Sequence, residues 1–178
     1  HSRQTFGNFS FRKDEGLRKE DVNSLREAFQ AAQAFAENPK GWLSLHGTYG
    51  SGKTHLAAAV GNYQAAKGAP PLFIVVPDLL DHLRAAFAPN SGINLDKRFN
   101  EVRTAQLLIL DDLGTQSATP WAREKLYQLF NYRYNAELPT VITSSALPDE
   151  LDQRLFSRMS DRRLCKIQII TAAGYTGK

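Results

Sequence analysis

The feature that most constrains this chain is an eight-residue run, Gly47-Thr48-Tyr49-Gly50-Ser51-Gly52-Lys53-Thr54, which fits the pattern G-x-x-x-x-G-K-T. Glycines at these places let backbone N–H groups converge on a phosphate with no side chain in the way. The pattern predicts that Lys53 reaches the β- and γ-phosphates of a nucleoside triphosphate and that the Thr54 hydroxyl reaches Mg²⁺. The loop has to lie between a strand and a helix, because the positive helix N-terminus completes the phosphate site.

The residues around this loop favour that arrangement. Residues 42–46 form a short apolar run typical of a buried strand, and the residues from His55 onward are typical of a helix. The alternative, a glycine-rich surface turn, does not explain this context. We therefore predict a nucleotide-binding set made up of Gly47, Gly50, Ser51, Gly52, Lys53, Thr54 and His55.

The bulk composition sets limits on the class of protein. With 178 residues, of which 42% are hydrophobic and 22% charged, the chain is typical of one soluble globular domain. Cys165 is the only cysteine, which excludes an intrachain disulfide and a zinc site built on cysteines. No apolar run is long enough to span a bilayer and no signal peptide opens the chain, so we expect a cytoplasmic protein without a membrane partner. The net charge of +4 permits a nucleic-acid partner but equally suits a mildly basic enzyme.

Two parts are expected along the chain. Residues 1–40 read as a lead-in arm and helix, and residues 41–178 as the nucleotide-binding core. His1-Ser2 resembles a cloning remnant, and the only Met is Met159. We therefore expect that the chain is a piece of a longer protein and that an upstream N-terminal module is absent from it.

Apolar strands alternate with amphipathic helices along the core. Strands are predicted over about 42–46, 72–76, 106–110, 139–143 and 166–170, and helices over about 20–37, from 55, from 78, 97–102, 120–135 and 149–159. Asp78 and Thr119 are the candidate N-caps of two of these helices. Because the strands are apolar throughout, the pattern favours a parallel α/β sheet covered by helices on both faces.

A second motif ends the third predicted strand. The apolar run 107–110 is followed by Asp111 and Asp112. A protein with a phosphate-binding loop needs an acid here to hold the Mg²⁺ water shell, and Asp111 is the candidate. Asp112 is placed to orient or deprotonate the attacking water, although it is shorter than the glutamate common at this place. The alternative is an ordinary strand-ending turn, in which acids are frequent.

These motifs together resemble a known family. The runs G-T-Y-G-S-G-K-T-H-L-A, L-L-I-L-D-D-L-G, L-P-T-V-I-T-S-S and R-L-F-S-R-M, and the lead-in T-F-G-N-F, are similar to the AAA+ ATPases of the bacterial replicative helicase-loader type (DnaC/DnaI-like). The resemblance covers nearly the whole chain. It implies a P-loop fold with a five-stranded parallel sheet in the order 5-1-4-3-2, ATP and Mg²⁺ as cofactors, and no separate helical lid domain. It also implies assembly into a ring or spiral with ATP between subunits.

The resemblance also assigns residues outside the two motifs. It places the polar sensor of the nucleotide on Ser144, where the family often has Asn, and the arginine finger on Arg158, with Arg154 one turn earlier. It places single-stranded DNA contacts on Lys97, Arg98 and Arg103. From the residues alone, an ordinary solvated basic helix accounts for either set of cations. Without a lid, Phe6 or Phe9 could help to form the adenine pocket, or both could simply pack the arm.

The leading hypothesis is therefore the ATPase domain of a helicase loader that assembles on single-stranded DNA and acts on the replicative helicase. One rival is a transposition helper ATPase of the IstB type, whose core is nearly indistinguishable. Another is a small-molecule P-loop kinase, but no substrate-binding lid loop is evident. A third is a nucleotide-gated adaptor with negligible hydrolysis, which the short Asp112 and Ser144 side chains make conceivable.

Overall fold

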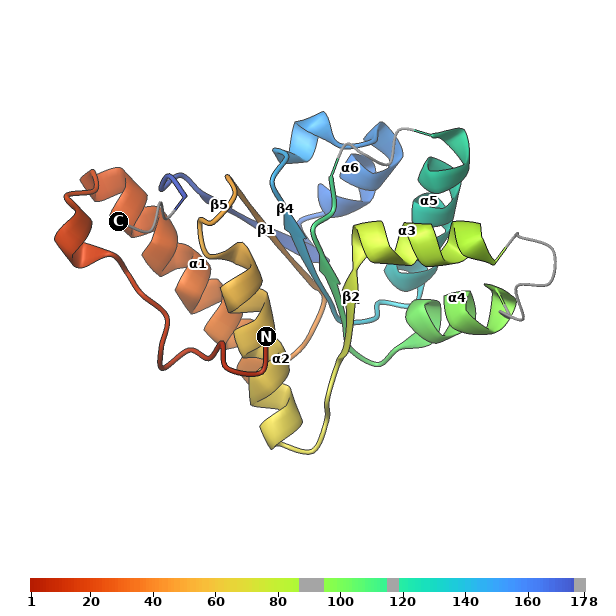
Figure 1. The fold of residues 1–178 in the computed structure, drawn as a ribbon, viewed down its shortest axis with the longest axis horizontal. Helices are drawn as coiled ribbons and strands as arrows, with labels where there is room; N and C mark the ends of the chain where they lie inside the picture. Colours follow the sequence, from red (N-terminus) through yellow and green to blue (C-terminus); the bar gives the residue numbers. More distant parts are fainter. Residues whose placement is uncertain (87–94, 115–118, 175–178) are drawn as a thin grey trace.

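A computed structural model describes residues 1–86, 95–114 and 119–174, with the side chains of Leu95 and Asp96 left out. Its centre is a five-stranded parallel sheet in the order β2-β3-β4-β1-β5, which confirms the predicted order (Figure 1). The strands are β1 (Trp42–Gly47), β2 (Leu72–Val75), β3 (Leu108–Asp111), β4 (Thr140–Ser144) and β5 (Cys165–Ile170).

Helices cover both faces of this sheet, as the apolar strands predict. On one face lie α1 (Lys19–Glu37) and α2 (Lys53–Ala66). On the other lie α3 (Val76–Ala85), α4 (Leu95–Thr104), α5 (Pro120–Asn135) and α6 (Gln153–Met159). Figure 1 shows the two groups on opposite sides of the strands. In the described part of the chain, no helix is both long and apolar enough to cross a membrane.

Successive side chains along a strand point to opposite faces, and this alternation builds two hydrophobic cores. In β3, Leu108 and Leu110 join the core under α3–α6, whereas Ile109 joins the core under α1 and α2. In β4, Val141 belongs to the second core and Ile142 to the first. Because both faces of the sheet are buried, its central strands favour apolar residues, and buried polar residues such as Ser44 and His46 bond to each other.

Two predicted helix boundaries differ from the structure. The second helix after the loop begins at Val76 directly after β2, so Asp78 lies in its first turn and is not its N-cap. The predicted helix over 149–159 is divided into a 3-10 turn, Pro148–Glu150, and α6. Asp152 starts α6 by accepting a hydrogen bond from the Arg154 N–H at 2.9 Å. Thr119 does cap α5, through the Ala122 N–H at 3.3 Å.

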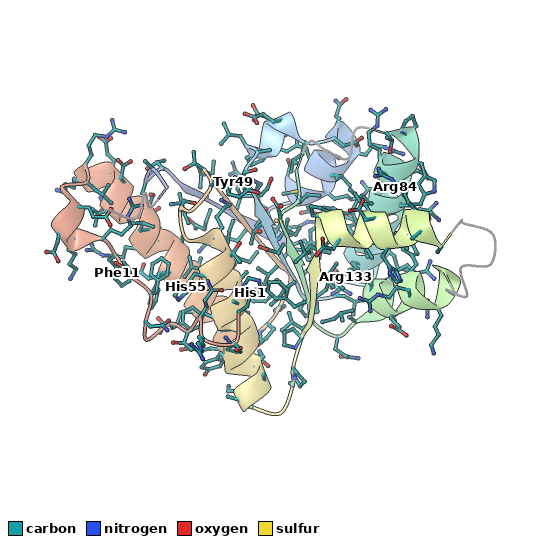
Figure 2. The ribbon with its side chains drawn as sticks, viewed as in Figure 1. His1, Phe11, Tyr49, His55, Arg84 and Arg133 are labelled. Atoms are coloured by element: carbon teal, nitrogen blue, oxygen red, sulfur yellow. The ribbon has the colours of Figure 1, made fainter. Side chains whose placement is uncertain are left out.

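The lead-in arm is anchored by aromatic rings. Phe6, Phe9 and Phe11 each contact Phe29 of α1, with ring centroids 4.9–5.6 Å apart. Figure 2 shows Phe11 and His55 on this side of the molecule, away from Arg133 among the helices of the other face. Phe6 and Phe9 therefore help to pack the arm against α1, and Phe9 also lies beside the glycine-rich loop.

Candidate nucleotide-binding and catalytic site

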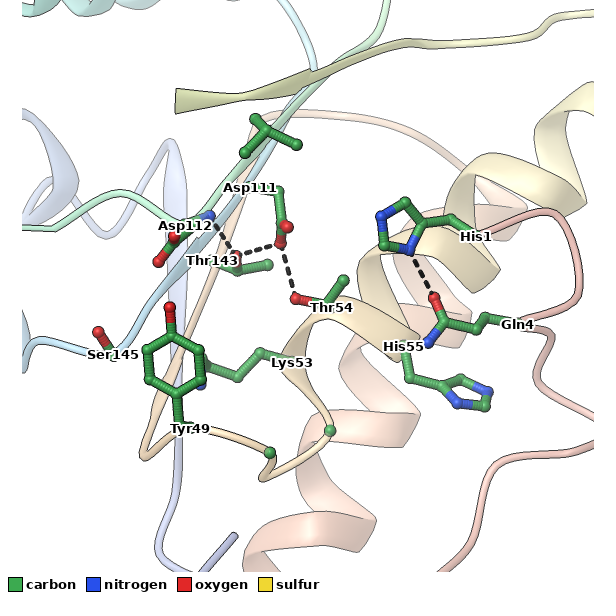
Figure 3. A pocket seen from close by; sticks show the side chains of 13 residues that line it. His1, Gln4, Tyr49, Lys53, Thr54, His55, Asp111, Asp112, Thr143 and Ser145 are labelled. Atoms are coloured by element: carbon green, nitrogen blue, oxygen red, sulfur yellow. Dashed lines mark hydrogen bonds between the residues drawn. The ribbon is translucent and has the colours of Figure 1, made fainter. Parts of the chain in front are cut away.

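A cavity of about 510 Å³ opens at the carboxyl ends of the strands, where the two sequence motifs meet. The glycine-rich loop between β1 and α2 forms one wall, and the ends of β3 and β4 form the other (Figure 3). Ligands of open parallel sheets bind at this edge. The predicted residues that line it are Gly50, Gly52, Lys53, Thr54, His55, Asp111 and Asp112.

The loop has the backbone that its glycines make possible. Gly50 and Gly52 have φ of 74° and 111°, values that L-residues with a side chain rarely adopt. A Cβ on Gly52 would also lie 3.0 Å from the Phe9 ring. Gly47 and Ser51 do not line this cavity; Gly47 lies against Ile170, and the buried Ser51 accepts a hydrogen bond from Lys53.

Lys53 is held inside the loop. Its ammonium donates to the Thr48 carbonyl at 2.7 Å and to the Ser51 hydroxyl at 3.4 Å. Burial lowers the pKa of Lys53, and the nearby charges of Asp111 and Asp112 act in the opposite direction. A partly desolvated ammonium ion surrounded by carbonyl and carboxylate oxygens is suited to binding the charged oxygens of a phosphate.

The hydroxyl of Thr54 and the carboxylate of Asp111 are in direct contact. Thr54 Oγ1 donates to Asp111 Oδ1 at 2.9 Å, and Thr143 Oγ1 donates to the same oxygen at 2.6 Å (Figure 3). One hydroxyl and one carboxylate, with room for water and phosphate oxygens, fit the octahedral oxygen shell of Mg²⁺. In the described part of the chain, no three His, Cys, Asp or Glu side chains gather as a metal site. A cage of protein ligands is not what Mg²⁺ beside a triphosphate requires.

Asp112 turns away from the strand at this point. Its φ of 64° is left-handed, a conformation that aspartate tolerates better than most residues. Its backbone N–H donates to Thr143 Oγ1 at 2.9 Å. The turn places the Asp112 side chain on the cavity wall, as expected for a group that acts on water near the phosphates.

The polar residue of β4 that reaches the cavity is Thr143, whereas the family resemblance predicts Ser144. Ser144 is fully buried; its hydroxyl donates to the Leu113 carbonyl and accepts from the Ala146 N–H at 3.1 Å. Neighbouring residues of a strand face opposite sides, so Thr143 points towards α2 and Ser144 points away. The assignment of the sensor to Ser144 therefore does not fit the geometry, and Thr143 and Ser145 line the cavity instead.

A buried histidine lies in β1, directly before the glycine-rich loop in the sequence. The ring of His46 is fully buried, donates from Nδ1 to the Ala146 carbonyl at 2.8 Å and accepts at Nε2 from the Ser44 hydroxyl at 2.5 Å. Burial lowers the pKa of His46, and the Lys53 charge lowers it further. The neutral ring thus links β1 to the turn that follows β4.

The arginine assigned as a finger does not line this cavity. Arg158 Nη2 donates to Asn131 Oδ1 at 3.1 Å, and the guanidinium lies 5.0 Å from the Tyr134 ring centroid on α5. Arg154 also lies against α5, over the Tyr127 ring at 4.3 Å and paired with Glu124 at 3.1 Å. A group that acts on a neighbouring subunit need not approach its own subunit's cavity, so this placement is compatible with the prediction.

The three cations assigned to DNA binding lie on α4 but not on one face. At 100° per residue, Lys97 and Arg103 are roughly 120° apart around the helix. Arg98 pairs with Glu101 at 3.5 Å. Arg103 instead turns towards α5, where it stacks on Tyr132 with 4.9 Å to the ring centroid. The structure therefore separates Arg103 from the other two.

A smaller cavity of about 320 Å³ lies between the lead-in arm and the loop. Phe9, Arg12 and His55 line it together with Gly50–Gly52. His55 donates from Nε2 to the Thr5 carbonyl at 2.7 Å and meets the Phe9 ring edge-on at 5.3 Å. The arm is thereby fixed beside the phosphate-binding loop.

Comparison with known proteins agrees with this geometry. The profile of the family described as IstB-like ATP binding protein matches residues 1–171. The replicative helicase loader DnaI of Bacillus subtilis (strain 168) is 33% identical over 121 residues, 67% of this chain and 38% of that protein. The replicative helicase loader DnaC of Escherichia coli (strain K12) is 28% identical over 141 residues, 79% of this chain and 57% of that protein.

The chain thus spans well under two thirds of the length of these curated relatives. A crystal structure of the DnaC helicase loader superposes with a TM-score of 0.74 at 24% identity, covering 94% of this chain and 97% of that one. The predicted fold and the predicted resemblance to helicase loaders are therefore confirmed. Because the family profile runs through the glycine-rich loop, β3 and β4, this protein belongs to the IstB-like ATP-binding protein family.

Proposed function

We propose that this chain is the ATPase domain of a cytoplasmic helicase loader, which binds ATP with Mg²⁺, assembles on single-stranded DNA and helps to place the replicative helicase. The observation that carries the proposal is the direct contact between Thr54 of the glycine-rich loop and Asp111 of β3. The two curated relatives bear the name of helicase loaders.

In this proposal the phosphates bind over the amino end of α2. Lys53 exchanges the Thr48 carbonyl for the β- and γ-phosphate oxygens, and the loop N–H groups bind the β-phosphate. Thr54 and Asp111 hold Mg²⁺, which neutralises charge on the phosphate oxygens when it is bound. The base fits the cavity between the arm and the loop, against Phe9.

Hydrolysis depends on two residues at the ends of β3 and β4. Asp112 orients the attacking water and accepts its proton, and Thr143 keeps the Asp111 carboxylate and the Asp112 backbone in place. Because the Asp112 side chain is one methylene shorter than the glutamate common at this position, we expect slow turnover in the isolated chain.

In an assembly, each subunit supplies a positive charge to the nucleotide bound by its neighbour. Arg158 leaves Asn131 and reaches the γ-phosphate of the adjacent subunit in a ring or spiral, with Arg154 beside it. A guanidinium supplied in trans typically accelerates phosphoryl transfer by about 10³-fold or more. Turnover per subunit should therefore rise with protein concentration.

The test is ATP turnover measured over a range of protein concentrations, with and without single-stranded DNA. We expect the rate per subunit to rise with concentration and with DNA, and Arg158→Ala to bind ATP as the parent does while losing that rise. Arg162→Ala, at an exposed site outside the assigned machinery, is the matched control. A rate per subunit independent of concentration in the parent, or an Arg158→Ala rate that still climbs, rejects the assembly-dependent mechanism.

The family match favours one second candidate, a transposition helper of the IstB type. Its core chemistry is the same, so the partner distinguishes the two functions. Binding of the chain, or of the longer protein that contains it, to a replicative helicase in the presence of ATP supports the loader. Binding to a transposase and not to the helicase supports the transposition helper.

A further inference from the structure

A further cavity lies between α4 and α5 and shares no lining residue with the nucleotide cavity. Figure 1 shows where these two helices lie. The volume of this further cavity is about 510 Å³. It is lined by Arg103, Gln128, Asn131, Tyr132, Asn135 and Ala136, and we call it the α4–α5 groove. None of the residues that line it is acidic, and none lines the nucleotide cavity.

The α5 side of this groove has an unusual composition for the exposed face of a helix. Its residues recur at intervals of three and four, so they form one stripe on the helix. From Leu126 to Asn135 the helix has a single charged residue, Arg133, and that side chain is buried. The exposed stripe consists of amides and one aromatic ring, with Tyr132 39% exposed. Amide groups donate and accept hydrogen bonds in the pattern of nucleobase edges.

Arg103 and Tyr132 form a cation–π pair at the side of the groove, which we call the Arg103–Tyr132 platform. The guanidinium lies 4.9 Å from the Tyr132 ring centroid and 5.7 Å from that of Phe99. Within the described residues, its one hydrogen bond is from Nη2 to Asn100 Oδ1 at 2.9 Å, and its buried Nε has no acceptor. Guanidinium planes and aromatic rings are the surfaces on which unpaired bases stack.

The buried Arg133 side chain holds the end of α4, and with it the Arg103–Tyr132 platform, in place. Its buried guanidinium donates to the carbonyls of Arg103 at 3.1 Å and Ala105 at 2.7 Å, where α4 ends, and to Thr140 Oγ1 at 2.9 Å. Two neighbouring residues of α5 thus hold Arg103. The Tyr132 ring contacts the Arg103 guanidinium, and the Arg133 guanidinium donates to the Arg103 backbone carbonyl. A site whose parts are already fixed loses little conformational entropy when a ligand binds.

From these contacts we propose that the α4–α5 groove is a base-binding subsite for single-stranded DNA, in which one or two bases stack on the Arg103–Tyr132 platform and meet the amides of Gln128 and Asn135. The inference rests on the proposed function in requiring that the chain binds single-stranded DNA. It adds that binding involves the bases as well as the backbone. Lys97 and Arg98, on another face of α4, are left to contact phosphates.

The chemistry of the groove favours a nucleic acid over a protein. The centre of a protein interface is fully desolvated and rich in apolar side chains. This groove offers one partly exposed ring, one alanine, three amides and a guanidinium. A cation beside an aromatic face, with no carboxylate to repel phosphate, is the combination found where single strands bind without sequence preference.

The test measures the affinity of the protein with ATP and Mg²⁺ for a fluorescent oligothymidylate of about 20 nucleotides. Tyr132→Leu keeps an apolar side chain but removes the aromatic face, and we expect it to weaken binding at least about fivefold. Tyr132→Phe should bind as the parent does. The matched control is Tyr63→Leu, which removes a ring that also carries a cation, Lys67 at 4.8 Å, on the other side of the sheet.

Two further measurements separate stacking from charge. The parent should prefer the oligothymidylate to an abasic strand of equal length, and Tyr132→Leu should lose most of that preference. Lys97→Gln should reduce the dependence of log affinity on log salt by about 0.7, the value for one phosphate contact on a single strand, whereas Tyr132→Leu should not change it. Thermal unfolding of each variant verifies that its fold is intact.

The outcomes are distinguishable. If the parent binds the oligonucleotide but Tyr132→Leu binds it equally well, the subsite is wrong and the proposed function stands. If Tyr132→Leu loses concentration-dependent turnover without losing DNA affinity, the groove is a protein contact and the inference is rejected. If the parent does not bind single-stranded DNA under any of these conditions, both the subsite and the DNA-binding part of the proposed function are rejected.

Discussion

Replacing Thr143 by valine tests the arrangement on which the nucleotide site depends. The Thr143 hydroxyl donates to Asp111 Oδ1 at 2.6 Å and accepts from the Asp112 N–H at 2.9 Å. Valine has nearly the same shape, so the substitution removes both hydrogen bonds without leaving a large cavity. Thr143 itself is buried, so water cannot easily replace the hydroxyl.

The loss of these two hydrogen bonds sets the expected decrease in the free energy of unfolding. A hydrogen bond to a charged group contributes about 1.5–3 kcal/mol to stability, and a buried N–H left without an acceptor costs about 1–3 kcal/mol. Allowing for partial relaxation of the turn at Asp112, we expect Thr143→Val to lower the free energy of unfolding by about 3 kcal/mol. In a domain of this size, that corresponds to a decrease in Tm of roughly 6 to 12 °C.

Urea denaturation measures this change as a shift of the midpoint at constant slope. Thr143→Ser, which keeps the hydroxyl, should recover most of the loss. Thr104→Val, the same substitution at an exposed position at the end of α4, should change stability by less than about 0.5 kcal/mol. The variant should also need more Mg²⁺ for ATP binding, because the Asp111 carboxylate is less well oriented. A Thr143→Val protein as stable as the Thr104→Val control would refute the reasoning.

The remaining predictions concern three side chains. Lys53→Ala should abolish or severely weaken ATP binding by calorimetry, because the loop loses its only ammonium group; unchanged affinity contradicts the assigned phosphate site. Burial raises the pKa of the Cys165 thiol to about 12, so at pH 8 a thiol reagent should label it only after urea unfolding, and rapid labelling of the folded protein contradicts its burial. Burial lowers the pKa of His46 in the folded state below its ordinary value of 6.5. The unfolded chain therefore takes up a proton at a higher pH than the folded protein does. The free energy of unfolding is consequently highest above pH 6.5 and decreases as the pH falls below that value. Urea unfolding between pH 7.5 and 5.5 should show this decline, and His46→Gln should reduce it.

The sheet and the loop could be predicted because their local signals agree with one another. The predicted strands are mainly apolar, which is typical of a parallel sheet covered on both faces. The strand order came from the family resemblance, since apolar patterns do not specify which strands are neighbours. The meeting of Thr54 with Asp111 then follows from that order, because β1 and β3 both flank β4 and all three end at the same edge.

Features that depend on a single tertiary contact were not predictable in the same way. Asp78 has the chemistry of an N-cap, yet α3 starts two residues earlier because β2 leads into it directly. The division of the last helix depends on Asp152, whose side chain binds a backbone N–H locally. Nothing in the sequence around Arg133 distinguishes it from the exposed cations of α5, although it is 1% exposed and binds the end of α4.

The position of Thr143 at the end of β4 can be predicted from the alternation of side chains along the strand. Ile109 and Val141 are paired in register and belong to the core beneath α1 and α2. Side chains alternate along a strand, so two residues later Asp111 and Thr143 must face that same side, towards Thr54. Ser144 must face the other side, whatever its chemistry. Counting alternate positions along β4 from Val141 therefore selects Thr143 as the residue that holds the Asp111 carboxylate.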